Sequence, residues 1–219
     1  MRTKICGIRS QDDLRIALRA GADAIGLICG INHRSEDEVT PEFARSITRA
    51  VPPFVSTVLV THRDTPEEIL ELADLTGVST IQVHGIVTLD TLQQVRERAG
   101  CRKVLKVIHV SGDDAIEEAL EAAEHCDGLL LDSRSKDRLG GTGQTHDWSI
   151  SRRIVEAVEA IGTPVILAGG LNPDNVAAAV EQVRPYGVDV NSGVDDAAGD
   201  KSPERCRAFV VGAGQASVS

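Results

Sequence analysis

The segment 129–148 combines an apolar run with side chains that could transfer protons. Three leucines at positions 129 to 131 predict a short buried strand, and Asp132 follows them directly. A carboxylate at the carboxyl end of a buried strand is where a parallel α/β barrel places its chemistry. The alternative is that Asp132 caps a turn, because aspartate is common in loops.

Two further side chains occupy strand ends of the same kind. Cys6 lies near the end of the first predicted strand, Thr3–Ile8, and His84 closes the strand that begins at Thr80. A thiol with a lowered pKa acts as a base or nucleophile, whereas an isolated cysteine more often fills a core. Lys4, two residues before Cys6, does not decide between these roles. For His84, a substrate-facing role and a structural role both stay open.

Two glycine-rich turns follow the last two predicted strands. The first contains Gly169, Gly170 and Asn172, and the second contains Ser192 and Gly193. Barrels often bind phosphate with the loops after strands seven and eight, through backbone N–H groups. Glycine lets the backbone approach the anion closely. We therefore predict a phosphate site here, against the alternative of two ordinary turns.

The elements that must position these residues alternate regularly between strands and helices. The predicted strands are Thr3–Ile8, Ala24–Ile28, Val55–Val60, Thr80–Val83, Lys103–Ile108, Asp127–Leu131, Pro164–Ala168 and Gly187–Asn191. The predicted helices are Ser10–Ala20, Pro41–Val51, Thr65–Leu75, Thr88–Ala99, Asp113–Ala123, Ser149–Ile161, Pro173–Val183 and Pro203–Val211. This order predicts a single-domain α/β fold, a (β/α)8 TIM barrel over residues 1–211 with a flexible tail at 212–219. A doubly wound open sheet is the alternative.

Composition excludes several classes of function. The chain has 219 residues, a formal net charge of −10 and five cysteines. The negative charge argues against nucleic-acid binding. No apolar run approaches the ~18 residues of a membrane span. The cysteines show neither a C-x-x-C pair nor metal-like spacing with histidine, which predicts a reduced, cytoplasmic protein without a metal site.

Five motifs in the predicted order resemble those of the phosphoribosylanthranilate isomerase family of tryptophan biosynthesis. They are Lys4–Ile8, Gln82–Gly85, Leu131–Ser133 with the glycines at 140–143 and Asp147-Trp148, Gly169–Pro173 and Val188–Val194. The resemblance covers residues 4 to about 208. It implies a (β/α)8 barrel that performs an Amadori rearrangement on a small phosphorylated sugar substrate, without metal or organic cofactor.

The resemblance also implies roles for individual residues. Asp132 would be the general acid that protonates the furanose ring oxygen, and Cys6 the general base that removes the C2′ proton. The substrate phosphate would be bound by the two glycine-rich turns and by Gly141. The predicted helices show no clear oligomer seam, so a monomer and a homodimer both stay open.

One loop departs from the family pattern. The family carries an arginine after strand two that pairs with the anthranilate carboxylate, and Asp37 stands in its place here. Arg34, with His33 beside it, is the candidate replacement, and His84 is a second candidate contact for the aglycone. Three hypotheses follow: an isomerase for phosphoribosylanthranilate, a paralogue that isomerises another phosphoribosyl amine, and a non-catalytic barrel that binds a sugar phosphate.

Overall fold

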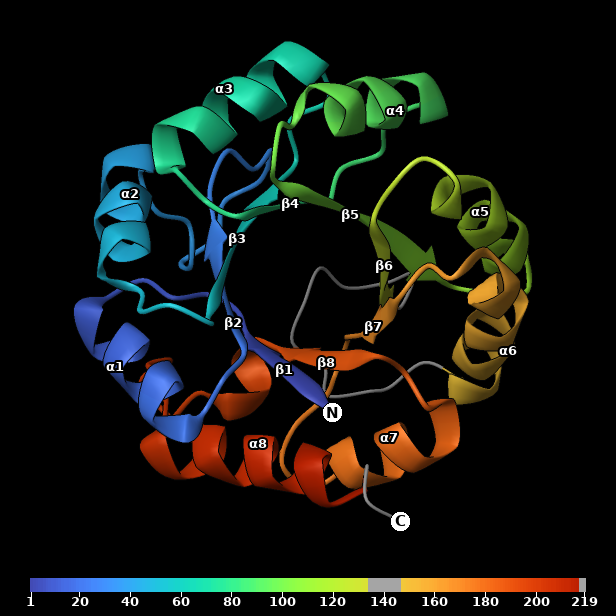
Figure 1. Ribbon diagram of the computed structural model, residues 1–219. Helices are drawn as coiled ribbons and strands as arrows, with labels where there is room; N and C mark the ends of the chain where they lie inside the picture. The colour runs from blue at the N-terminus through green and yellow to red at the C-terminus, as the bar shows by residue number, and fades with distance from the viewer. Residues whose placement is uncertain (134–146, 217–219) are drawn as a thin grey trace.

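The computed structural model describes residues 1–133 and 147–216, and they form eight alternating strands and helices (Figure 1). The strands are β1 (Arg2–Ile5), β2 (Ala24–Ile28), β3 (Ser56–Thr61), β4 (Thr80–Val83), β5 (Lys103–Val110), β6 (Gly128–Ser133), β7 (Val165–Leu167) and β8 (Gly187–Val190). The helices are α1 (Gln11–Ala20), α2 (Pro41–Ala50), α3 (Pro66–Thr76), α4 (Leu89–Arg98), α5 (Asp114–Ala123), α6 (Trp148–Val158), α7 (Val176–Val183) and α8 (Pro203–Ala216). Short 3-10 helices η1 (Glu159–Ile161) and η2 (Ser192–Val194) follow α6 and β8.

The eight strands form a closed parallel barrel, and the helices surround it as an outer ring (Figure 1). Closure is made by β1 and β8, which pair in parallel with Thr3 opposite Val188 and Ile5 opposite Val190. The predicted (β/α)8 barrel is therefore confirmed. The doubly wound open sheet is excluded, because an open sheet would leave two edge strands unpaired.

Local sequence signals explain where the helices begin. The side chains of Ser10, Thr40, Thr65 and Thr88 each accept a hydrogen bond from a backbone N–H in the first turn of α1, α2, α3 and α4. Such caps satisfy N–H groups that have no partner inside the helix. Pro41 and Pro66 occupy the first turns of α2 and α3, where proline costs no hydrogen bond.

Strand boundaries differ from the predictions in ways that matter for the site. β1 ends at Ile5, so Cys6 lies just beyond the strand. β5 continues to Val110 and β6 to Ser133, because the two strands keep pairing and place His109 opposite Asp132. Asp132 therefore lies within a strand, and the alternative of a loop acid capping a turn is wrong.

The chain also differs from the prediction near its C-terminus. Residues 212–216, predicted as part of a flexible tail, belong to α8. Ala213 is fully buried against the barrel, which stabilises this last stretch of helix. The barrel domain accordingly extends past residue 211.

Apolar packing lies in two places. The main cluster of buried side chains fills the space between the strands and the helices. A separate small cluster joins Val107, Leu130, Ile166 and Ala168 on β5, on β6, on β7 and just after it. Since alternate residues of a strand point to opposite faces, this small cluster belongs to the barrel interior. Both faces of the strands are therefore covered.

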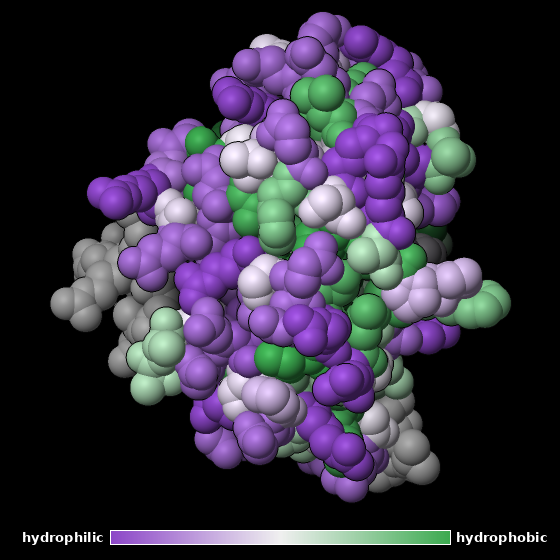
Figure 2. Space-filling model, turned by 90° about the vertical axis from the view of Figure 1, so that its left-hand side faces the viewer, coloured by the Kyte–Doolittle hydropathy of each residue, from purple (hydrophilic) through white to green (hydrophobic). Residues whose placement is uncertain are grey.

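One face of the molecule is mainly hydrophilic. Hydrophilic side chains cover most of the face shown in Figure 2, with apolar residues lying between them. Within the described residues, no helix is long and apolar enough to cross a membrane.

Replacing Phe209 with alanine tests the packing of α8. Phe209 is fully buried, so Phe209→Ala should lower the free energy of unfolding by about 3–5 kcal/mol. Val211 on the same helix is 45% exposed, and Val211→Ala should cost less than about 1 kcal/mol. Urea unfolding of both variants measures the difference, and equal losses would contradict this account of the core.

Candidate active site

The inward face of the barrel turns polar at the carboxyl ends of the strands. On β5 and β6, His109 and Asp132 lie two residues beyond the interior positions Val107 and Leu130. Side chains two apart on a strand share a face, so both point into the mouth of the barrel. Lys4 and Cys6, on the β1 side, are also two residues apart, so their side chains share the inward face.

Cys6 lies above a buried ion pair. Lys4 Nζ is 2.8 Å from Asp189 Oδ2, and both side chains are less than a tenth exposed. A Cβ added at Gly26 on β2 would lie 2.6 Å from Cys6 Sγ and 3.0 Å from Lys4 Cε. Gly26 therefore makes the space that lets the thiol and the lysine occupy one interior pocket.

The electrostatic setting of Cys6 has two opposing parts. Burial raises the pKa of the Cys6 thiol above its ordinary value, and the carboxylate of Asp189 adds to this rise. The ammonium groups of Lys4 and Lys201 act against it. Burial is the largest of these influences, so the net effect is a raised pKa that favours the thiol over the thiolate.

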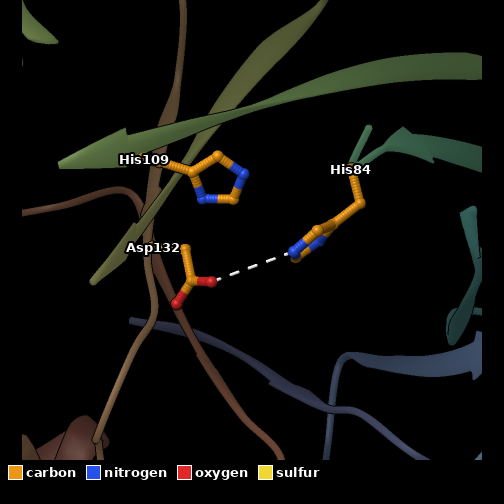
Figure 3. A group of neighbouring side chains, drawn as sticks. All are labelled: His84, His109 and Asp132. Atoms are coloured by element: carbon orange, nitrogen blue, oxygen red, sulfur yellow. Dashed lines mark ion pairs between the residues drawn. The ribbon is translucent and has the colours of Figure 1, made fainter. Parts of the chain in front are cut away.

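Four imidazole rings form a row along the opposite side of the mouth. Ring centroids of His33 and His62 are 5.1 Å apart, those of His62 and His84 are 5.0 Å apart, and those of His84 and His109 are 5.5 Å apart. Asp132 lies beside the row near His84 and His109, and its Oδ2 is 3.9 Å from His84 Nε2 (Figure 3). We call these four side chains the histidine row.

Hydrogen bonds orient three of these rings. Asn32 Oδ1 lies 3.3 Å from His33 Nδ1 and 2.9 Å from His62 Nδ1. A carbonyl oxygen only accepts, so each of these two rings carries its proton on Nδ1. The amide Nε2 of Gln82 donates to His84 Nδ1 at 3.3 Å, which places the proton of the neutral His84 ring on Nε2. His84 therefore presents a donor toward Asp132.

Three groups of the site have the composition of a transition-metal ligand set. Ligand atoms of His84, His109 and Asp132 all lie within 4.8 Å of one another (Figure 3). Two histidines and one carboxylate suit several divalent metals. The same three groups equally suit proton transfer. Their arrangement alone does not distinguish metal binding from proton transfer.

The loop after β7 is built from left-handed glycines. Gly169 and Gly170 have φ values of 82° and 67°, which other residues rarely adopt. Asn175 fixes the loop, since its Oδ1 accepts from Asn172 N at 2.8 Å and its Nδ2 donates to Gly170 O at 3.0 Å. Asn172 Oδ1 in turn accepts from the N–H of Asp174. Asn172 thus shapes this loop through both its N–H and its side-chain oxygen.

The loop after β8 approaches the loop after β7 very closely. A Cβ at Gly193 would lie 1.9 Å from the carbonyl oxygen of Leu171, so only glycine fits at this position. Ser192 and Gly193 lie in the 3-10 helix η2, which directly follows Asn191. The predicted phosphate residues on these two loops are therefore adjacent in space. Gly141 lies outside the described residues.

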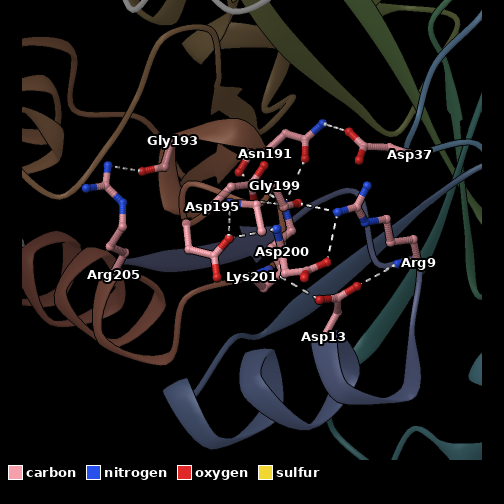
Figure 4. Close-up of polar contacts among 12 residues, drawn as sticks. Arg9, Asp13, Asp37, Asn191, Gly193, Asp195, Gly199, Asp200, Lys201 and Arg205 are labelled. Atoms are coloured by element: carbon pink, nitrogen blue, oxygen red, sulfur yellow. Dashed lines mark hydrogen bonds and ion pairs between the residues drawn. The ribbon is translucent and has the colours of Figure 1, made fainter.

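A polar network anchors the loop after β8 (Figure 4). The Lys201 ammonium donates to Asn191 O at 3.2 Å, to Asn191 Oδ1 at 3.0 Å and to Asp195 Oδ1 at 2.6 Å. Arg205 donates to Gly193 O at 2.8 Å, and Arg9 donates to Gly199 O at 2.6 Å. These cations hold the backbone carbonyls of the loop.

Asp37 belongs to this network. Its Oδ2 accepts a hydrogen bond from Asn191 Nδ2 at 2.9 Å (Figure 4). The loop after β2 is thereby tied to the end of β8. Arg34 is exposed and makes no hydrogen bond or ion pair with any other described residue.

The structure brings most of the predicted residues to one mouth of the barrel. Cys6, Asp132 and His84 lie at the carboxyl ends of their strands, and the two glycine-rich loops follow the neighbouring strands β7 and β8. Sequence reasoning missed His62, His109 and Lys201. For the histidines a signal was present, because β3, β4 and β5 all have a histidine at or just past their ends. Lys201 gave no local signal.

The chain matches a family model from residue 3 to residue 211. That model is described as N-(5′-phosphoribosyl)anthranilate (PRA) isomerase. The chain belongs to this family.

Curated relatives agree with the family match over nearly the whole chain. The chain is 42% identical over 212 residues to N-(5′-phosphoribosyl)anthranilate isomerase 2 of Methanosarcina mazei, covering 96% of this chain and 92% of the relative. It is also 42% identical to the N-(5′-phosphoribosyl)anthranilate isomerase of Haloferax volcanii, covering 97% and 92%.

Solved structures of the family share the fold. The phosphoribosylanthranilate isomerase of Thermotoga maritima superposes with a TM-score of 0.87 at 34% identity, covering 98% of this chain and 99% of that one. A phosphoribosylanthranilate isomerase complex with reduced 1-(o-carboxyphenylamino)-1-deoxyribulose 5-phosphate gives a TM-score of 0.82 at 32% identity, with the same coverage.

Thiol alkylation tests the burial of the cysteines. Cys101 is exposed, whereas Cys6, Cys29, Cys126 and Cys206 are buried. Burial raises the pKa of each of these four thiols, to about 11 for Cys29 and Cys206. Iodoacetamide at pH 8 should therefore label Cys101 first, because thiolate is the reactive form. Mass spectrometry locates the label, and Cys101→Ser should take up almost none. Rapid labelling of Cys6 would show an accessible thiolate and contradict this description.

Replacing Lys201 tests the anchor of the loop after β8. Lys201→Met leaves the carboxylate of Asp195 in a largely buried position without its cation, so the free energy of unfolding should fall by about 3 kcal/mol. Arg205→Met removes an exposed cation from the same loop and should cost less than about 1 kcal/mol. Denaturant unfolding compares the two, and a stable Lys201→Met variant would be inconsistent with this anchor.

Proposed function

We propose that this chain catalyses the isomerisation of N-(5′-phosphoribosyl)anthranilate to 1-(o-carboxyphenylamino)-1-deoxyribulose 5-phosphate. This is an Amadori rearrangement, an intramolecular oxidoreduction that converts an aldose into a ketose. The observation that carries the proposal is the position of Cys6 and Asp132 at one mouth of the barrel, in a chain that matches the isomerase family from residue 3 to residue 211.

Asp132 supplies the proton for ring opening. The carboxylic acid donates to the furanose ring oxygen, the bond between this oxygen and C1′ breaks, and C1′ and the amine nitrogen form an iminium cation. Asp132 is half-buried, with its side chain 24% exposed, and His84 presents an N–H toward it. His84 is thus placed to position the carboxyl group and the leaving oxygen.

Cys6 completes the rearrangement as general base. The thiolate removes the C2′ proton, and the electrons of that bond form the C1′–C2′ double bond and neutralise the iminium. The resulting enol becomes the ketone when C1′ gains a proton and the hydroxyl on C2′ loses one. An iminium cation beside Cys6 supplies the positive charge that favours the thiolate over the thiol.

The phosphate fixes the sugar between these two groups. We assign it to the loops after β7 and β8, with Gly169, Gly170, Asn172, Ser192 and Gly193 as the proposed contacts. Backbone N–H groups suit this task in a chain of net charge −10, because they need no basic surface. Anchoring at a distance from the reacting bonds keeps C2′ near Cys6 and the ring oxygen near Asp132.

The reaction needs no metal or organic cofactor in this proposal. A divalent cation bound by His84, His109 and Asp132 would hold the carboxylate ionised, and an ionised Asp132 has no proton to donate. We therefore assign these three groups to proton transfer and substrate contact. His84 and Arg34 are the proposed contacts for the aglycone.

A paralogous reaction on a cationic aglycone has less support. Acidic residues in the loop after β2 would favour a neutral or cationic aglycone over a carboxylate. Asp37, the acid that replaces the family arginine, is bonded to Asn191 at the end of β8. Its carboxylate therefore already has a partner in the loop network.

The setting proposed for the enzyme is the cytoplasm. All five cysteines are free thiols, as expected in a reducing compartment. A monomer and a homodimer both fit the proposal, because every proposed catalytic residue comes from one chain.

Loss of turnover in two variants tests the assigned roles. Cys6→Ser and Asp132→Asn should each lower kcat by about 10²–10⁴-fold, because each removes a proton-transfer group that acts in the transition state. The assay follows the fall in anthranilate-type fluorescence of freshly prepared phosphoribosylanthranilate.

Matched controls separate chemistry from folding. Cys101→Ser changes an exposed thiol, and Asp64→Asn changes an exposed acid just after β3. Both should keep normal kcat, and all four proteins should have native circular dichroism. Near-normal turnover in Cys6→Ser or Asp132→Asn would remove the proposed role from that residue.

A further inference from the structure

A single hydrogen bond joins two loops across the mouth of the barrel. Asn191 Nδ2, at the end of β8, donates to Asp37 Oδ2 on the loop after β2 at 2.9 Å (Figure 4). β1 lies between β2 and β8 in the closed sheet, so this bond spans the carboxyl end of β1. Cys6 and Gly7 directly follow that end. We call the bond between Asp37 and Asn191 the clasp.

The clasp packs on the chain that leaves Cys6. The N–H of Cys6 donates to Val190 O at 2.8 Å, which continues the pairing of β1 with β8. A Cβ added at Gly7 would lie 2.3 Å from Asn191 Oδ1, so the Asn191 amide lies directly against the backbone of Gly7. Gly7 has a φ of 73°, in the left-handed region that favours glycine. The turn that follows Cys6 is therefore formed against the Asn191 side chain.

Lys201 fixes which end of the Asn191 amide faces Asp37. The Lys201 side chain is only 2% exposed, and its ammonium donates to Asn191 Oδ1 at 3.0 Å. An ammonium cannot accept a hydrogen bond, so the amide oxygen faces Lys201 and the amide nitrogen faces position 37. The group at position 37 must then be an acceptor. A carboxylate meets this requirement, whereas a guanidinium only donates.

The backbone beside Asp37 is held against β2. Glu38 pairs with Ile28 at the end of β2, and the N–H of Val39 donates to Ile28 O at 2.9 Å. Asp37 is half-buried, so its hydrogen bond in the clasp is partly shielded from water. The clasp thus joins two segments that the barrel already holds in place.

We propose that Asp37 is a positioning residue for Cys6, on which it acts through Asn191 and Gly7. The inference rests on the proposed function, in which Cys6 is the general base. Asp37 contributes an acceptor atom rather than a negative charge, and it does not touch the substrate. Since the placement of Cys6 against C2′ governs the rate of proton removal, loss of the clasp lowers kcat.

Removing the acceptor is the first test. Asp37→Ala should lower kcat by about tenfold, because a small displacement of a catalytic group is costly in rate. KM should change by less than about threefold, since the proposed phosphate loop keeps its own anchors, Lys201 and Arg205. Asp37→Asn keeps an oxygen acceptor and should retain most of the turnover. Glu36→Ala, at an exposed acid beside Asp37, is the matched control and should have normal kcat.

Exchanging donor and acceptor is the second test. Asn191→Asp keeps the size of the side chain and an acceptor for Lys201, but it places two carboxylates together and should lower kcat by about tenfold. In the double variant Asn191→Asp/Asp37→Asn, the new amide at position 37 donates to the new carboxylate at position 191. This variant should recover most of the lost kcat. The assay again uses phosphoribosylanthranilate, on proteins with native circular dichroism.

Each other outcome contradicts a defined part of the argument. Normal kcat in Asp37→Ala, or a double variant no faster than Asn191→Asp alone, would overturn the inference and leave the proposed function intact. Asp37→Arg should lose turnover as Asp37→Ala does. A kcat/KM for Asp37→Arg above that of the wild-type protein would show that position 37 contacts the substrate, and would likewise overturn the inference. A wild-type protein without turnover would overturn the proposed function together with this inference.

Discussion

The barrel closes where a buried cation meets a buried anion. Lys4 of β1 and Asp189 of β8 are register partners at the closing seam, and their side chains form an ion pair inside the barrel. Removing either charge alone would leave the other buried without compensation, a cost of several kcal/mol. The pair lies next to Cys6, so one interaction both joins the seam and sets the electrostatic surroundings of the proposed base.

The mouth above this seam has two sides with different chemistry. On the β7 and β8 side, left-handed glycines and a loop anchored by Lys201 present backbone groups. On the β3 to β5 side, imidazole rings stack in a row. A chain of net charge −10 attracts no anion by its overall field, so the substrate phosphate proposed for this mouth needs local donors.

The fold was predictable from sequence because it depends on local patterns. Alternation of apolar runs with capped amphipathic segments gave the order of the elements, and two glycine-rich turns marked β7 and β8. Contacts between distant residues were not predictable. The bond between Asp37 and Asn191 joins residues 154 positions apart, and no pattern in either segment indicates it. The histidine row was predictable only in part. Three strand-end histidines are apparent in the sequence, but their stacking depends on barrel closure.

The raised pKa of Cys6 gives an order to the proposed reaction. In the ligand-free protein burial outweighs the nearby ammonium groups and favours the neutral thiol. Protonation of the ring oxygen by Asp132 creates an iminium cation, and that charge then lies beside the sulfur. A cation at this distance stabilises the thiolate. The iminium also makes the C2′ proton acidic, so in the proposed mechanism proton donation by Asp132 precedes or accompanies proton removal by Cys6.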